Sequence, residues 1–165
     1  SFAEGETVMD KQEFTQRVLE AEPSLYRVAK SIAVNERDCE DAVQEAILTA
    51  YDKLSSLRNE KYFKTWLIRI LINECYRVIK KRGSIVSFED YMADSTVSDE
   101  NIDIELRDAI LSLPTKIRAA IVLYYIEGYD VEEVGYIMKI PSGTVKSRLH
   151  KGRKLLRCAL KDAEI

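Results

Sequence analysis

Apolar residues recur every three or four positions along most of the chain, which is the spacing of helices that bury one face. In the first half this pattern covers three segments, over residues 10–33, 38–54 and 61–81. The first segment forms one helix or two, with Pro23 near a break or in a first turn. Asp38 is predicted to cap the second helix, and Gly83 is predicted to end the third.

The second half contains shorter apolar segments separated by turn residues. A first helix is expected from Ile102, followed by Pro114 in the first turn of the next helix. Gly128 ends that helix. Residues 131–139 form another, and a sharp turn leads into the last helix, which the hydroxyl of Ser142 can cap. Two short helices joined by such a turn predict a helix-turn-helix.

Between the two halves lies a polar, acidic segment, residues 84–101, which has no apolar period and is predicted to be a linker. The chain is therefore predicted to be all-α, with two small helical domains, residues 9–83 and 102–165, joined by a flexible acidic linker. Residues 1–8 precede Met9, the expected native start, and are interpreted as a cloning remnant.

The composition is typical of a helical, globular protein. The chain has 165 residues, of which 46% are hydrophobic and 32% charged, and it contains only 3 Pro and 6 Gly. We expect no membrane span and no secretory signal. The three cysteines form no CxxC pair and there is one histidine, so we expect packing cysteines in a reducing compartment, no zinc site and no cofactor.

The net charge of −3 hides an uneven distribution. Residues 61–82 hold seven Lys or Arg against one acid, and residues 143–161 hold seven against none. Residues 89–108, between these basic blocks, hold eight acids against one Arg. Two basic blocks indicate two surfaces for nucleic acid, and the acidic segment would repel DNA or shield the basic faces in the free protein.

The last helix combines a buried stripe with a small, polar and basic face. The stripe consists of Val145, Leu149, Gly152 and Leu156. The opposite face carries Gly143, Thr144, Ser147, His150, Lys151 and Lys154. Small residues at the start of a helix let it approach base edges in a major groove, while the cations behind them bind phosphates. His150 is expected to face a phosphate or solvent, and Gly135 suits a close crossing of two helices.

Three groups of motifs occur in order along the chain. Residues 38–46 read DCEDAVQEA, and residues 63–70 read FKTWLIRI, followed by Asn73. The third group lies at residues 113–114, 124–128 and 143–149. In this order they resemble regions 2.2, 2.3 with 2.4, and 4 of the extracytoplasmic-function (ECF, group IV) sigma factors of the sigma-70 family. The resemblance covers nearly the whole chain from Met9, and three motifs in this order are far more specific than a helix-turn-helix alone.

The resemblance implies that the helix over residues 38–54 docks on the clamp coiled coil of the largest catalytic polymerase subunit. The docking residues would be Asp41, Gln44, Glu45 and Leu48. An acidic, amide-bearing face around one leucine is a reasonable surface for a protein partner. Taken without the resemblance, the same pattern describes an ordinary solvated helix face.

Regions 2.3 and 2.4 of this family melt the promoter −10 element and hold its non-template strand. That task needs cations for phosphates and flat or polar groups for flipped-out bases. The resemblance assigns it to Tyr62, Phe63, Lys64, Arg69, Asn73, Tyr76, Arg77, Lys80 and Lys81, with further charge from Arg82. The loop over residues 57–61 would help to form the pocket for a captured base. Trp66 is interpreted as core, because it shares a face with Ile70.

Region 4 of the family binds the −35 element through its recognition helix. The residues implied are Ser142, Thr144, Lys146, Ser147, Arg148 and Lys151. Arg148 lies at the flank of the helical wheel and is expected to bind a phosphate rather than read a base.

The function implied is that of an alternative sigma factor, which directs core RNA polymerase to promoter DNA with −10 and −35 elements and catalyses nothing itself. An anti-sigma factor, membrane-bound in many members, would hold it inactive in the cytoplasm, at the inner face of the membrane, until an envelope or extracytoplasmic stress. No small-molecule substrate is expected. The sequence leaves the placement of the two domains in the free protein open, with the acidic linker favouring compaction.

Two other classes of protein are weighed against this one. A dimeric regulator with a sensing domain would need a ligand pocket or a phosphoacceptor aspartate in place of the basic third helix, and we find neither. An enzyme would need a P-loop, a metal cluster or a Ser/His/Asp set, and the sequence contains none of these motifs.

Overall fold

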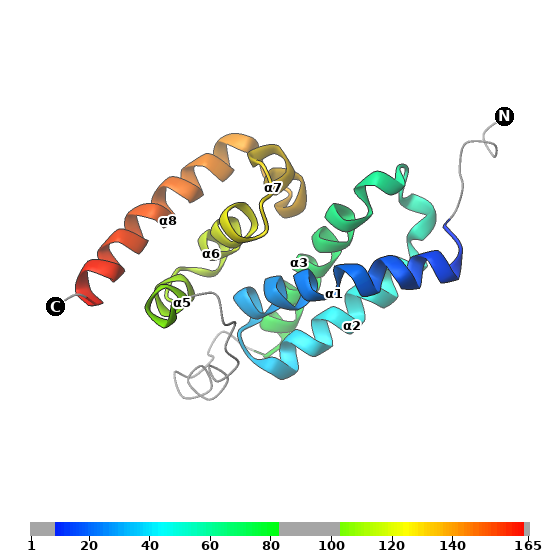
Figure 1. Ribbon diagram of the computed structural model, residues 1–165, viewed down its shortest axis with the longest axis horizontal. Coiled ribbons are helices and arrows are strands. Elements are labelled where there is room, and N and C mark those ends of the chain that lie inside the picture. Colours follow the sequence, from blue (N-terminus) through cyan, green and yellow to red (C-terminus); the bar gives the residue numbers. More distant parts are fainter. Residues whose placement is uncertain (1–8, 83–102, 164–165) are drawn as a thin grey trace.

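The computed structural model describes residues 9–82 and 103–163, and Figure 1 shows how its helices are arranged. All regular elements within these ranges are helical, as predicted, and they form two bundles. The predicted linker over residues 84–101, the segment 1–8 and Gly83 lie outside the described residues. No helix in the two ranges is long and apolar enough to span a lipid bilayer.

The first bundle consists of three long helices that pack against one another in pairs. They are α1 (Lys11–Ala33), α2 (Glu36–Asp52) and α3 (Phe63–Arg82). Two short 3-10 turns connect α2 to α3, namely η2 (Leu54–Ser56) and η3 (Glu60–Tyr62). The apolar faces predicted by the helical period meet in the middle, where Leu25, Val43 and Leu67 are fully buried.

The first helix, α1, is continuous through Pro23, so residues 11–33 form one helix and not two. Pro23 lies on the exposed side, where water can bind the carbonyl that a proline leaves without a donor. Ala21 and Leu25, on either side of it, are buried in the bundle, and this packing holds the helix together. Asp10 caps the N-terminus by accepting a hydrogen bond of 2.8 Å from the Glu13 N–H.

The turn between α1 and α2 contradicts the prediction that Asp38 caps α2. Asn35 is the cap, and its side chain accepts a hydrogen bond of 3.2 Å from the Asp38 N–H. Because Val34 takes a φ of 66° directly after Ala33, the chain reverses within two residues and Asn35 already occupies the cap position. Asp38 is buried instead, and its carboxylate pairs with Arg82 at the end of α3, at 3.0 Å.

The second bundle packs short helices against a long one. Its elements are α5 (Ile104–Leu111), α6 (Thr115–Ile121), the π-helical turn η4 (Val122–Ile126), α7 (Val131–Met138) and α8 (Ser142–Ala163). Pro114 directly precedes α6, in the cap position rather than in the first turn. Gly128 has a φ of 79° and turns the chain after η4, as predicted for a glycine that ends a helix.

The predicted helix-turn-helix is formed by α7 and α8. Asp130 and Glu133 make a reciprocal capping box at the start of α7. Gly135 allows the close approach that was predicted, since a Cβ at this position would lie 2.8 Å from the carbonyl oxygen of Ile140. Ser142 is the first residue of α8 and not, as expected, the cap before it.

The two bundles pack directly against each other, α7 against α3 and α6 with η4 against α1 (Figure 1). Arg118 of α6 is buried at this junction, where its guanidinium donates hydrogen bonds to the carbonyl oxygens of Ser31 and Ile32. Arg27 of α1 forms a bidentate ion pair with Glu127, with N···O distances of 3.0 and 3.1 Å. These contacts place the two domains in one closed arrangement.

Candidate functional site

The exposed face of α2 carries every residue that the resemblance assigns to polymerase docking. These are Asp41, Gln44, Glu45 and Leu48, of which Leu48 is 60% exposed. Tyr51 lies one turn further on and is 47% exposed. Its ring packs edge-on against Phe14 at the border of the core, with the centroids 5.3 Å apart. The face therefore presents two apolar side chains among acids and an amide.

The exposed side chains of α3 present cations and an amide to solvent. The exposed residues among those assigned to the −10 strand on this helix are Lys64, Asn73, Arg77, Lys80 and Lys81. Two arginines of this helix also pair with buried acids, Arg77 with Glu74 at 3.5 Å and Arg82 with Asp38 at 3.0 Å. The lysines supply charge that can follow the phosphates of a single strand.

Phe63 does not take the place predicted for it among the base-contacting residues. It is only 3% exposed, and its ring packs against Phe14 and Trp66 with centroid distances of 5.8 and 6.1 Å. The reason is visible in the sequence, because Phe63 is three and four positions before Trp66 and Leu67 and so falls on the buried face of α3. The core interpretation of Trp66 is confirmed, since that side chain is buried.

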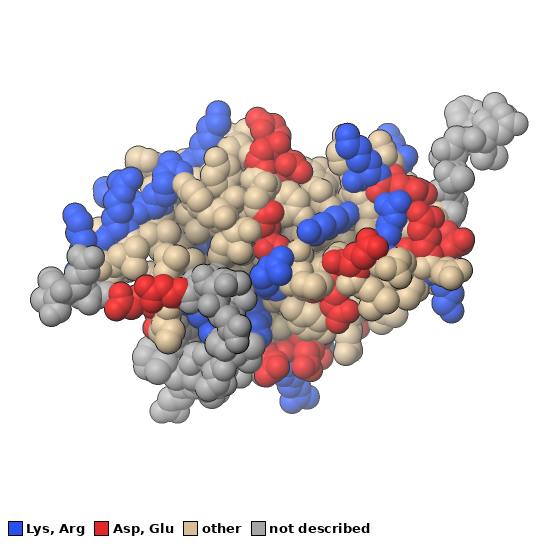
Figure 2. Space-filling model, in the orientation of Figure 1, with Lys and Arg blue, Asp and Glu red and all other residues tan. Residues whose placement is uncertain are grey.

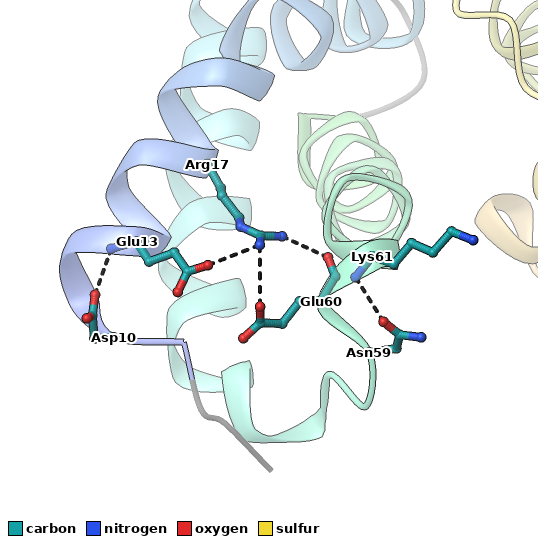
Figure 3. A network of polar contacts seen from close by, with 6 residues as sticks. All are labelled: Asp10, Glu13, Arg17, Asn59, Glu60 and Lys61. Atoms are coloured by element: carbon teal, nitrogen blue, oxygen red, sulfur yellow. Dashed lines mark hydrogen bonds and ion pairs between the residues drawn. The ribbon is translucent and has the colours of Figure 1, made fainter. Parts of the chain in front are cut away.

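Tyr62 is the aromatic residue that this end of α3 offers to solvent. Its side chain is 53% exposed, and the Lys61 ammonium lies 5.8 Å from its ring centroid. The turn that carries it is bonded to α1 through Arg17, which donates to the Glu60 carbonyl oxygen at 2.8 Å (Figure 3). Arg17 has no place among the predicted residues, but its position four residues after Glu13 on one helix face indicates an ion pair, which forms at 3.0 Å.

Two residues assigned to the −10 strand, Arg69 and Tyr76, are half-buried rather than exposed. The Arg69 guanidinium lies over the Tyr136 ring, 4.5 Å from its centroid. A hollow of about 410 Å³ beside this pair is lined by Arg69 from α3 and by Lys139 and Ser142 from the helix-turn-helix. Tyr76 is half-buried, and burial raises the pKa of its hydroxyl although the nearby charge of Arg148 lowers it.

The face of α8 shows the stripe and the polar side that its sequence predicts. Val145, Leu149 and Gly152 are buried, while Lys146, Ser147 and Lys151 are exposed. Figure 2 shows Lys and Arg side chains gathered along α8, at the left of the view. The remaining residues assigned to the −35 element, Ser142, Thr144 and Arg148, are half-buried. The solvent-facing side of the helix is thus small and basic, as a major groove requires.

The described residues offer little for redox or metal chemistry. Among them, no group of three or more His, Cys, Asp or Glu side chains is arranged to hold a metal ion. Cys39 and Cys75 are buried, and burial raises the pKa of the Cys75 thiol far above its ordinary value, which keeps it protonated. Cys158 is exposed at the C-terminal end of α8.

Comparison with known families identifies both bundles. The family Sigma-70 region 2 matches residues 18–85, and the family Sigma-70, region 4 matches residues 103–156. The chain is 32% identical to the ECF RNA polymerase sigma factor SigW of Bacillus subtilis, over 93% of this chain and 91% of SigW. The chain belongs to the ECF RNA polymerase sigma factors. The α1–α3 bundle is its region 2, and the α5–α8 bundle is its region 4.

Other ECF sigma factors show the same relationship. The ECF RNA polymerase sigma-E factor of Haemophilus influenzae is 32% identical over 74% of this chain and 75% of its own length. The structure is also similar to that of the sigma factor RpoE from Bartonella quintana, solved in complex with the anti-sigma factor NepR. That similarity has a TM-score of 0.73 with 28% identity, and covers 91% of this chain and 98% of RpoE. The chain is accordingly an alternative sigma factor, a protein of promoter-specific transcription initiation.

Substitutions of the neighbouring residues Phe63 and Tyr62 are predicted to have very different effects on the free energy of unfolding. Phe63→Ala removes a buried ring and is expected to lower the free energy of unfolding by about 3–5 kcal/mol. Tyr62→Ala removes an exposed ring and should change it by less than about 0.5 kcal/mol. Urea denaturation followed by circular dichroism measures both, and a mild effect of Phe63→Ala would contradict the placement of this side chain in the core.

Proposed function

We propose that region 2 docks on core RNA polymerase through the exposed face of α2. The observation that carries this proposal is the exposure of Leu48 and Tyr51 among acidic and amide side chains. Large apolar groups that stay exposed in a folded chain mark contact sites, and acids around them disfavour DNA and favour a basic protein surface. The residues proposed for this contact are Asp41, Gln44, Glu45 and Leu48, with Tyr51 added to the predicted set.

Region 2 further holds the non-template strand of the −10 element along α3 and the turn before it. Lys64, Lys80 and Lys81 contact phosphates, while Tyr62 and Asn73 present a ring and an amide to unstacked bases. Arg69 and Tyr76 join this surface when region 4 moves away from α3. Phe63 supports the surface from inside and does not touch the strand.

Region 4 binds the −35 element by inserting the start of α8 into the major groove. Ser147 and Lys151 approach base edges from the exposed side, and Lys146 and Arg148 bind the flanking phosphates. Ser142 and Thr144 lie at the N-terminus of the helix, where main-chain N–H groups and short hydroxyls suit a phosphate. The domain limits proposed are residues 9–83 for region 2 and 102–165 for region 4, with 84–101 as the linker.

The activity of the protein is regulated by an anti-sigma factor in the cytoplasm, which releases it on an envelope or extracytoplasmic stress. The support for this proposal is the overall similarity to RpoE of Bartonella quintana, which was solved with the anti-sigma factor NepR. Attachment of the anti-sigma factor to the inner face of the membrane belongs to the same proposal. The protein itself needs neither a cofactor nor a small-molecule substrate, and its effect on transcription comes from binding alone.

The α2 contact predicts how promoter opening responds to charge reversal. In Gln44→Lys/Glu45→Lys, two positive charges replace an amide and an acid, which should weaken core binding by at least about tenfold. Opening is read as permanganate reactivity of −10 thymines in the presence of core polymerase and the full chain. We expect reactivity with the wild-type chain and its loss with the variant at limiting concentration.

The chain offers a matched control for this experiment. Gln16 and Glu20 are also an exposed Gln and Glu, and they lie on α1 instead of α2. Gln16→Lys/Glu20→Lys should open the promoter as the wild type does. Equal loss in both variants would contradict the proposed docking face. Tight duplex binding by the wild-type chain alone, with no opening when core is added, would contradict the polymerase role and favour a dimeric regulator.

A further inference from the structure

The turn that presents Tyr62 is tied to α1 by the Arg17 side chain (Figure 3). The guanidinium donates to the main-chain carbonyl oxygen of Glu60 at 2.8 Å and reaches its carboxylate at 3.4 Å. Glu13, one turn earlier in α1, accepts from the same guanidinium at 3.0 Å and fixes its orientation. Arg17 therefore joins the start of α1 to a segment 43 residues later in the chain.

The hydrogen bond from Arg17 to the Glu60 carbonyl oxygen can fix the direction in which Tyr62 points. The same oxygen accepts the Phe63 N–H that closes η3, so it is held from both sides. Asn59 adds two local bonds, since its side chain accepts from the Lys61 N–H and its carbonyl from the Tyr62 N–H, both at 3.0 Å. Along the chain, Tyr62 thus lies between two fixed groups, the Glu60 carbonyl that is bonded to α1 and the buried ring of Phe63.

We propose that Arg17 is a positioning residue for base recognition, which keeps the turn in the shape that offers Tyr62 and Asn59 to one base of the −10 strand. This inference rests on the proposed function of α3. A side chain held in its binding geometry loses less conformational entropy on contact and tolerates fewer wrong partners. Loss of Arg17 should therefore weaken the choice of base at one position more than the binding of the strand, because the phosphate contacts lie elsewhere on α3.

The test is a selection of non-template strands from a library randomised over the −10 region, bound by holoenzyme made with the full chain. Arg17→Ala should reduce the base preference at one position by at least about fivefold. This is the smallest change in binding expected from the loss of one base–aromatic stacking contact. The preferences at the other positions should remain. Tyr62→Ala should affect the same position, and combining the two variants should add little.

Two comparisons keep this test specific to positioning. Arg17→Lys keeps the charge but places all its donors on a single nitrogen, and it should restore part of the preference. Arg37→Ala removes an exposed positive charge from α2 and should leave the preference unchanged. A preference in Arg17→Ala equal to wild type, or a loss spread evenly over all positions, would overturn the inference. A wild-type holoenzyme that selects no −10 motif would instead contradict the proposed function, and this inference with it.

Discussion

The buried guanidinium of Arg118 determines how the two halves of this chain are placed. A buried charge needs a partner for each of its polar groups, and a guanidinium carries five N–H donors in a fixed plane. The carbonyls of α1 and those of Leu111 and Leu113, before α6, meet this need from two sides. The negative end of the α1 dipole adds to the attraction. One side chain thereby couples the end of region 2 to the start of the helix-turn-helix domain.

That coupling divides the functional surfaces into two groups. The face of α2 around Leu48 and the turn around Tyr62 remain exposed with the domains closed. On the inner part of α3, Arg69 lies against the Tyr136 ring of region 4, and Tyr76 is half-buried. A chain built in this way can meet polymerase first and uncover the rest of its DNA-binding surface afterwards. The order of binding is then a property of the fold and needs no additional segment.

The periodic part of the structure could be predicted from the sequence, and the terminal and junction residues could not. The helical period places α1–α3 and α8 correctly, because it reports burial averaged over many residues. Single positions at helix ends depend on geometry that the period does not contain, which is why Asn35 replaces Asp38 as a cap. Phe63 belongs to the motif that suggests base contact, but its spacing from Trp66 places it on the buried face of α3. The sequence does mark Arg118, because it is the lone cation in the apolar run of residues 117–123 and so falls on a buried helix face.

The closed arrangement of the free chain is the central claim, and a distance between the domains tests it most directly. Dyes on Arg37→Cys in α2 and Lys154→Cys in α8, with Cys158→Ser, allow energy transfer to be followed; Cys39 and Cys75 are buried and stay unlabelled. In the free chain we predict one narrow population with a short distance between the dyes. In the promoter-bound holoenzyme this distance should increase by several tens of ångströms, because the −10 and −35 elements are about 25 base pairs, or about 85 Å, apart. A free chain that already shows the distances of the promoter complex would contradict the account.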